Sequence, residues 1–394
     1  MAGLKAAKST GVGTDQLRRH NLAAILTLVH HAGSQPRSAL TAQTGLNRST
    51  VAALVGELTE LGLVYETEPD ATKQVGRPSP TVNADRRNVA IAVNPEVDAV
   101  TAGVVTLGGQ VAETVRHETA APPTAAEAVE IAVALIDRLT AELAADVRVI
   151  GVGVAAPGLV RDEDGLIRLA PHLHWVDEPF EAMLAAATGY RVSVGNDARL
   201  GALVEHIYGA GRGGDDLVYL NGGPSGIGGG VITRGTLLGG ASGYAGEFGH
   251  TRAGGGGDVD LESLVRRADL LAAVGRGAAS PGELDELVLG SDDPAVLEVV
   301  HRQLAALAPA LGDAINILNP PLIVLGGFLS TIYQRDPAYL EERVAAQSLA
   351  APFEDVTIAP AGLGSDLLMI GAAELTFSGL LADPAGYGRA AARD

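Results

Sequence analysis

The chain lacks cysteine altogether, so disulfide bonds and thiolate-bound metals are excluded. It also lacks any run of about 20 apolar residues that is free of glycine or charge, and its polar start does not resemble a signal peptide. A secreted disulfide scaffold is therefore ruled out. We expect a cytoplasmic protein without a membrane span.

Lysine is scarce and unevenly placed, because all three lysines lie within the first 87 residues. That segment has 10 basic and 7 acidic residues, a net charge of +3, whereas the remainder has 18 and 40, a net charge of -22. An acidic surface repels a polyanion, so any contact with nucleic acid is expected in the first 87 residues. The length of 394 residues and the hydrophobic content of 47% suffice for two or three folded domains.

The amino-terminal segment is predicted to be helical after a flexible lead over residues 1–14. Apolar residues at helical spacing predict a first helix over residues 15–31 and a second over residues 37–44. Asn47 can cap a third helix, which Gly62 ends. The short TGLN link between the second and third helices is typical of a helix-turn-helix, whose second helix enters the major groove of DNA.

Two strands are predicted after the third helix, one over Leu63–Glu66 and one in the stretch VGRPSPTVNAD, and together they form a β wing. The residues expected on DNA lie at the starts of the second and third helices and in the wing: Arg37, Asn47, Arg48, Ser49, Thr50 and Arg77, with Ala53 further along the third helix. A three-helix packing module with solvated arginines is the alternative. The basic net charge of the first 87 residues and the β wing favour DNA binding over this alternative.

From residue 88 onward, apolar strands alternate with helices, which predicts an α/β fold with helices packed on sheets. Strands are expected at NVAIAV, AVTAGVVTL, VRVIGVGVA, VYLNGG, GVITRGTLL and LIVLGG, and helices over about residues 124–145, 293–318 and 365–381.

Two polar clusters interrupt this body. In RVSVGNDARLG, Asn196 and Asp197 follow a strand, which is where α/β proteins hold ligands, although Asp197 could also be a helix cap. In the second cluster, the glycine-rich turn NGGPSGIGGG precedes Glu247, His250 and Glu262. Glycine permits close backbone approach, and carboxylate and imidazole groups suit a polyhydroxylated ligand such as a sugar.

Longer motifs extend over about residues 15–382, nearly the whole chain: TGLNRSTVAALVGELTELGLV, VGRP, VAAPGLV, VGNDARLGALVE, SGIGGGVITRGTLLGGASGYAGEFGH, DLE, NPPLIVLGG and IGAAEL. GEFGH after a GIGGG loop is highly specific. On these motifs the chain resembles the ROK family of repressors, open reading frames and sugar kinases. Within it, the chain resembles the sugar repressors of the xylose and N-acetylglucosamine type, which begin with a winged helix.

The resemblance implies a winged helix-turn-helix joined to two α/β subdomains of the actin-like ATPase (ribonuclease H-like) sugar-kinase fold. We expect the winged helix over residues 15–87, the first subdomain over 88–198 and 364–382, the second, sugar-binding and dimerising, over 199–363, and a tail over 383–394. The family's sugar-binding positions fall on Asn196, Asp197, Glu247, His250 and Glu262.

Two departures from the family pattern bear on activity. Family kinases hold phosphate with a DxGGT-type loop, whereas this chain reads AVNPEVDAVTAG, in which Pro95 removes an amide donor. We therefore expect no kinase activity, which leaves Asp197, at the position of the kinase base, as a hydroxyl acceptor. The family's zinc-binding cysteines are absent beside His250, and Asp258 and Asp260 do not complete a zinc cage. We expect no metal and no cofactor.

The leading hypothesis is a repressor of carbohydrate genes that binds double-stranded operator DNA as a homodimer or homotetramer and responds to a sugar. An ATP-dependent sugar kinase with a DNA-binding appendage is the alternative. A third hypothesis is a constitutive DNA-binding protein whose inherited pocket is empty. The sequence leaves open which sugar or sugar phosphate binds and whether it releases the DNA.

Overall fold

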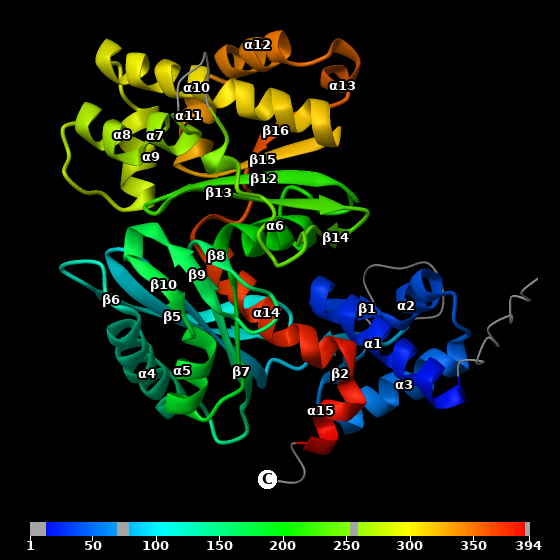
Figure 1. The fold of residues 1–394 in the computed structure, drawn as a ribbon. Coiled ribbons are helices and arrows are strands. Elements are labelled where there is room, and N and C mark those ends of the chain that lie inside the picture. The colour runs from blue at the N-terminus through cyan, green and yellow to red at the C-terminus, as the bar shows by residue number, and fades with distance from the viewer. Residues whose placement is uncertain (1–12, 69–78, 253–258, 391–394) are drawn as a thin grey trace, which may run out of the picture. The chain divides into compact units, whose positions relative to one another are not determined.

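The computed structural model describes residues 13–68, 79–252 and 259–390, and these fall into two compact units (Figure 1). The smaller unit comprises Met1–Asn88, Thr106–Gly109 and Phe377–Asp394. The larger unit comprises Val89–Val105 and Gln110–Thr376. The finer division of the larger unit at residues 198 and 363 stays a prediction.

Three helices form the centre of the smaller unit: α1 (Thr14–Ala32), α2 (Arg37–Thr44) and α3 (Arg48–Glu60). Their buried faces carry apolar residues at helical spacing, each at most 4% exposed: Leu22, Ile25, Leu26, Val29, Leu40, Val51, Leu54, Val55 and Leu58. All three predicted helices are confirmed. The apolar residues whose spacing predicted them form their buried faces.

Short-range polar contacts set the ends of α2 and α3. Gly45 has a φ of 68° and its amide donates to the carbonyl of Thr41 at 3.1 Å, which ends α2 in the left-handed conformation that glycine allows. Asn47 then starts α3, since its side-chain oxygen accepts from the amide of Thr50 at 2.9 Å. The predicted cap at Asn47 is confirmed.

The smaller unit also contains an antiparallel sheet of β1 (Ser34–Pro36), β3 (Thr81–Ala84) and β2 (Val64–Thr67), in that order. The two predicted wing strands correspond to β2 and β3. The predicted contact residue Arg77 lies outside the described residues.

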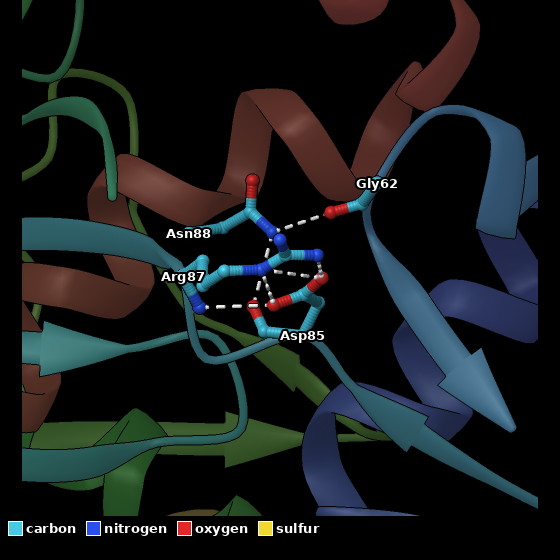
Figure 2. Close-up of polar contacts among 4 residues, drawn as sticks. All are labelled: Gly62, Asp85, Arg87 and Asn88. Carbon is cyan, nitrogen blue, oxygen red and sulfur yellow. Dashed lines mark hydrogen bonds and ion pairs between the residues drawn. The ribbon is translucent and has the colours of Figure 1, made fainter. Parts of the chain in front are cut away.

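Polar side chains fix the chain where it leaves the wing (Figure 2). Arg87 donates from Nη2 to Asp85 Oδ2 at 2.6 Å and from Nε to Asp85 Oδ1 at 3.0 Å. Asn88, only 2% exposed, donates from Nδ2 to the carbonyl of Gly62 at 2.8 Å and to that of Asp85 at 3.0 Å. These bonds join the turn after α3 to the start of the next strand.

Two further segments belong to the same unit: the turn Thr106–Gly109, and the chain end that contains the last part of α14 (Leu367–Ala382) and α15 (Pro384–Ala390). The buried His30 of α1 accepts at Nδ1 from the amide of Gly108 at 2.8 Å. Its ring meets that of Phe377 edge-on, with 5.2 Å between centroids. The winged helix therefore shares one core with segments distant in sequence.

The larger unit contains two five-stranded sheets. The first has the order β11-β7-β4-β5-β6, with β4 (Asn88–Pro95), β5 (Ala99–Thr106), β6 (Gln110–Glu118), β7 (Arg148–Ala156) and β11 (Val192–Asn196). Its other elements are helices α4 (Ala125–Ala141) and α5 (Phe180–Thr188), the 3-10 turn Pro171–Leu173, and a small sheet of β8 (Leu159–Val160), β9 (Ile167–Ala170) and β10 (Trp175–Glu178).

The second sheet has the order β14-β13-β12-β15-β16, with β12 (Leu217–Gly223), β13 (Gly226–Thr233), β14 (Thr236–Leu237), β15 (Leu322–Gly327) and β16 (Thr357–Pro360). The helices that follow are α7 (Leu261–Leu264), α8 (Arg267–Ala273), α9 (Pro281–Leu289), α10 (Pro294–Leu318), α11 (Phe328–Arg335), α12 (Pro337–Gln347) and α13 (Ala350–Glu354), with 3-10 turns at Phe248–His250 and Gly364–Asp366. Figure 1 shows α10, α11 and α12 on the side of this sheet away from α6.

Helix α6 (Asp197–Ile207) connects the two sheets, since it packs on β12 and β13 and also contacts β7 and β11. The predicted strands of the body are present except that GVITRGTLL forms two strands, β13 and β14, because the chain turns at Arg234 and Gly235, which both have positive φ. The helix predicted over residues 124–145 ends earlier, at Ala141, because the chain turns there and the amide of Leu143 donates to the carbonyl of Thr140 at 3.2 Å.

By length and composition alone, one helical stretch in the described part of the chain, Gly364–Ala382, could cross a membrane, with a mean hydropathy of 1.3. However, 61% of that apolar window is buried within the protein, as in the core helix of a folded domain.

Candidate functional site

A cleft in the larger unit brings together residues from both five-stranded sheets. Its lining includes all five residues predicted to bind a sugar: Asn196, Asp197, Glu247, His250 and Glu262. These side chains come from segments up to 66 positions apart in the chain. Their convergence is what the resemblance implied, and their role in sugar binding stays a prediction.

Asn196 and Asp197 lie where β11 passes into α6. Asn196 is the helix cap, because its Oδ1 accepts from the amide of Arg199 at 2.8 Å, while its Nδ2 donates to the carbonyl of Gly158 at 2.9 Å. Asp197 is the first residue of the helix, and its Oδ1 accepts from the amide of Ala198 at 2.7 Å. The sequence allowed Asp197 as the helix cap, and the structure corrects this, because the cap is Asn196. Among the described residues, the hydrogen bonds of the Asp197 carboxylate are made by its Oδ1.

The electrostatic surroundings of Asp197 are acidic. Burial, together with the nearby Glu96 and Glu247 carboxylates, raises the pKa of Asp197 to about 7. Asp197 therefore changes between carboxyl and carboxylate near neutral pH, and in both forms it can hydrogen-bond a hydroxyl group.

Glu247, His250 and Glu262 enter the cleft from the segment after β13. Burial raises the pKa of Glu247, with His250 opposing the shift and Glu262 adding to it. Glu262 accepts at Oε2 from the amide of Ile227 at 3.4 Å. This approach needs glycine at position 226, where φ is 103° and a Cβ atom would collide with the Glu262 carboxylate.

His250, Asp260 and Glu262 form the set in the cleft region that could hold a cation, since their ligand atoms lie within 4.8 Å of one another. His250 Nδ1 lies 3.4 Å from Asp260 Oδ2 and 3.8 Å from Glu262 Oε1. Asp260 is also the cap of α7 and accepts from the amide of Ser263 at 3.2 Å. Asp258, considered with them from the sequence, lies outside the described residues, and the expectation of no zinc stays a prediction.

Four further polar residues line the cleft that sequence reasoning did not select: Glu96, His172, Asn221 and Ser225. Glu96 follows β4 and accepts from Arg116 Nη1 at 3.1 Å, while Arg116 Nη2 donates to Asp98 at 3.1 Å. Glu96 lies three residues beyond the predicted strand NVAIAV, and that position near a strand end was a usable signal. His172 belongs to the turn between β9 and β10, where no motif or periodicity pointed to a site.

The residues predicted to contact DNA have different surroundings. Arg48 and Ser49 are exposed at the start of α3, and Thr50 is half-buried. Asn47 is occupied as the helix cap and also accepts from the hydroxyl of Ser49 at 2.7 Å. Arg37 is half-buried and forms an ion pair with Glu66 of the wing strand β2. These roles on DNA are untested predictions.

The chain matches known proteins over most of its length. The ROK family model matches residues 90–378. A xylose repressor of Caldicellulosiruptor bescii is 26% identical over 381 residues, covering 88% of this chain and 93% of that protein. A glucokinase of Thermotoga maritima is 30% identical over 248 residues, covering 57% of this chain and 78% of that enzyme.

Among solved structures, a ROK family transcriptional regulator described as a homologue of the E. coli MLC protein superposes with a TM-score of 0.74. It is 22% identical, and the match covers 93% of this chain and 97% of that one. The likeness confirms the predicted α/β fold, a winged helix followed by the actin-like sugar-kinase fold. With the family model matched over well more than half of its length, the chain belongs to the ROK family.

Proposed function

We propose that the chain is a sugar-responsive transcriptional repressor of carbohydrate genes. One observation carries the proposal: five polar side chains suited to hydroxyl groups converge on a single cleft, in a chain that begins with a winged helix. The xylose repressor of C. bescii supports it, because the match covers 88% of this chain and 93% of that protein.

On the DNA side, we propose that the start of α3 enters the major groove. Arg48 and Ser49 are exposed there, and the cap at Asn47 fixes the direction of the helix. Arg37 is proposed as a phosphate contact that exchanges its ion pair with Glu66 for one with DNA. Thr50 and the wing residue Arg77 complete the proposed interface.

We also propose that the chain has lost kinase activity. In the turn between β4 and β5, Pro95 has no amide hydrogen, and the amide of Glu96 donates to the carbonyl of Ala99 at 2.7 Å. The turn thus presents the Glu96 carboxylate to the cleft instead of free amide donors. Phosphoryl transfer depends on groups that neutralise phosphate charge, and a carboxylate does the opposite.

Sugar binding would act on DNA affinity through the connection between the sheets. Asp197 begins α6, which contacts both sheets, so a ligand that bonds Asp197 on one side and Glu247 on the other would change their separation. Effector and DNA affinities are then linked reciprocally. We propose a cytoplasmic protein that binds operator DNA as a homodimer or homotetramer, with two recognition helices about one turn of DNA apart.

The test is retardation of DNA fragments from upstream of sugar-uptake genes by the full chain, repeated with xylose, glucose and N-acetylglucosamine. We expect a specific complex that one of these sugars shifts, and no shift with Glu247→Ala. Glu298→Ala, an exposed glutamate of α10, is the matched control and should respond like the wild type. Failure to bind any such fragment, or a complex that no sugar alters, would contradict the proposal.

The alternative hypothesis, an ATP-dependent sugar kinase, is tested by incubating the purified chain with ATP, magnesium and each sugar. We expect no sugar phosphate above the background of the same reaction without protein. Turnover of a hexose at about one per second or faster, within the usual enzymatic range, would overturn the assignment as a non-enzyme.

A further inference from the structure

Carboxylates predominate among the ionisable side chains of the cleft. Its described lining includes four carboxylates and two imidazoles but neither lysine nor arginine: Glu96, Asp197, Glu247, Glu262, His172 and His250. A phosphate monoester carries a charge of about -1.5 to -2 at neutral pH, and proteins recognise it with Arg, Lys or free backbone amides. The cleft offers the opposite charge pattern.

Among the described residues that line the cleft there is neither lysine nor arginine, and two arginines near it are held by acceptors of the protein. The sequence has no lysine beyond residue 73, and the segment 253–258 reads AGGGGD. Arg116 donates to both Glu96 and Asp98. Arg199 is held by Asp162 and the carbonyl of Gly243. These two guanidinium groups are already bound to acceptors of the protein.

Backbone amides at the start of α6 are also occupied. The amide of Ala198 donates to Asp197 Oδ1, and that of Arg199 donates to Asn196 Oδ1. A helix start that could otherwise bind an anion is therefore capped by the protein's own side chains. In the β4–β5 turn, the amide of Glu96 is likewise bonded to Ala99.

We propose that the cleft selects an unphosphorylated, uncharged sugar against its phosphate ester, and that Glu96 is a residue that determines this selectivity. The inference rests on the proposed function, because it takes the cleft to be the effector site. Glu96 is set apart from the five candidate sugar residues, since it lies on the turn after β4 and is fixed there by Arg116. Its charge repels a phosphate group, whereas a hydroxyl group can donate to it.

The experiment is calorimetric titration of the full chain at pH 8 with three matched pairs: xylose with xylose 5-phosphate, glucose with glucose 6-phosphate, and N-acetylglucosamine with its 6-phosphate. We expect the wild type to bind the free sugar of the preferred pair at least about tenfold more tightly than the phosphate. Glu96→Gln, which keeps the shape and an oxygen acceptor for Arg116, should narrow this ratio at least about fivefold. Glu130→Gln, an exposed glutamate of α4, removes the same charge elsewhere and should leave the ratio unchanged.

A measurement on the wild type alone gives a second test. Raising the salt concentration from about 0.05 to 0.5 M screens repulsion between charges, so the relative affinity for the phosphate should improve while that for the free sugar stays constant. Phosphates that bind as tightly as free sugars would overturn the inference and leave the proposed function intact. An unchanged ratio in a folded Glu96→Gln chain would overturn the role of Glu96. Absence of binding by every sugar would contradict the proposed function itself.

Discussion

Arg199 and Asp162 join two parts of the larger unit through a buried guanidinium group. Arg199 Nη1 donates to Asp162 Oδ1 at 2.8 Å and Nη2 donates to Asp162 Oδ2 at 3.2 Å, while the side chain of Arg199 is only 8% exposed. The same Nη1 donates to the carbonyl of Gly243 at 2.8 Å. Gly243 precedes Glu247 by four residues, so Arg199 holds the loop that carries a candidate sugar residue.

Arg199→Lys should therefore weaken sugar binding as well as stability. A lysine is a single point charge and cannot reproduce the paired bonds to a carboxylate and a carbonyl. We expect the free energy of unfolding to fall by about 2 to 4 kcal/mol, because the contacts of a buried charge are lost. We expect sugar affinity to fall at least about fivefold, which is roughly 1 kcal/mol. Urea unfolding and calorimetry measure the two effects.

The control is Arg161→Lys in the turn beside Asp162, where the ion pair with Asp164 is exposed to solvent. Exposed pairs contribute little to stability, so this variant should unfold and bind sugar like the wild type. Sugar affinity equal to that of the wild type in a folded Arg199→Lys chain would show that Arg199 supports the fold only.

Sugar binding should depend on pH through Asp197. Its pKa of about 7 means that the carboxylate predominates at pH 8 and the neutral carboxyl at pH 6. A carboxylate is the stronger acceptor for sugar hydroxyl groups, so we expect affinity to fall as pH is lowered from 8 to 6. Titrations at several pH values test this, and Asp197→Asn, which cannot ionise, should bind more weakly with a flat profile over the same range.

The raised pKa of Asp197 also makes the free energy of unfolding depend on pH. Here low pH, at which Asp197 is protonated, favours the folded state. The pKa of Asp197 rises from 3.8 when unfolded to about 7 when folded, so the native state binds the proton more tightly. This contribution is fully present below pH 3.8 and is lost as pH rises to about 7. Relative to Asp197→Asn, the wild type should therefore lose stability between pH 4 and pH 7 and show no further difference above that. Unfolding midpoints that run in parallel for the two chains would contradict the raised pKa.

Substitutions at two glycines distinguish the cost of backbone strain from the displacement of a side chain in the cleft. Gly226 and Gly235 both have positive φ, at 103° and 69°, but a Cβ atom would meet Glu262 at position 226 and nothing within 4 Å at position 235. Gly235→Ala should cost roughly 1 kcal/mol of stability through backbone strain and leave sugar binding intact. Gly226→Ala should in addition displace Glu262 and abolish measurable sugar binding. Equal effects of the two variants on calorimetric affinity would rule out the role given to the Gly226–Glu262 contact.

Local patterns made the winged helix predictable. Its helices follow from the helical spacing of apolar residues such as Leu22, Val29 and Val55, which are buried, and from the cap at Asn47. Both signals lie within short stretches of sequence and do not depend on distant residues. The strand end at Asn196 was predictable for the same reason. Its role as the cap of α6, with Asp197 one position inside the helix, depends on backbone geometry that residue type alone does not fix.

The remaining parts of the cleft depend on contacts between distant segments. Glu96 becomes part of it only because the β4–β5 turn meets the start of α6, and His172 because a turn of the small sheet β8–β10 lies at its edge. A strand of two residues such as β8 carries too little alternation to be recognised in a sequence. Glu247, His250 and Glu262 were predicted from the family motifs. Their spacing in the sequence alone would not have placed them beside Asn196.

At the start of α3, neighbouring residues should affect DNA binding for different reasons. Asn47→Ala removes the acceptor for the amide of Thr50, so it should cost about 1 kcal/mol of stability and weaken DNA binding by fraying the first turn. Arg48→Ala leaves the cap intact and should not change stability, because Arg48 is exposed. If Arg48 contacts a base, its loss should cost about 1 to 3 kcal/mol of binding and relax sequence preference at one position of the operator.

If Arg48 contacts a phosphate instead, binding should weaken to a similar degree on every sequence, and the salt dependence of the affinity should decrease by about one unit of slope. Fluorescence anisotropy with operator variants at several salt concentrations distinguishes the two contacts. Arg138→Ala on α4, an exposed arginine of the larger unit, provides the charge-matched control and should bind like the wild type. An Arg48→Ala chain that binds the operator as tightly as this control would exclude Arg48 from the DNA interface, and Arg48 is the only arginine of α3.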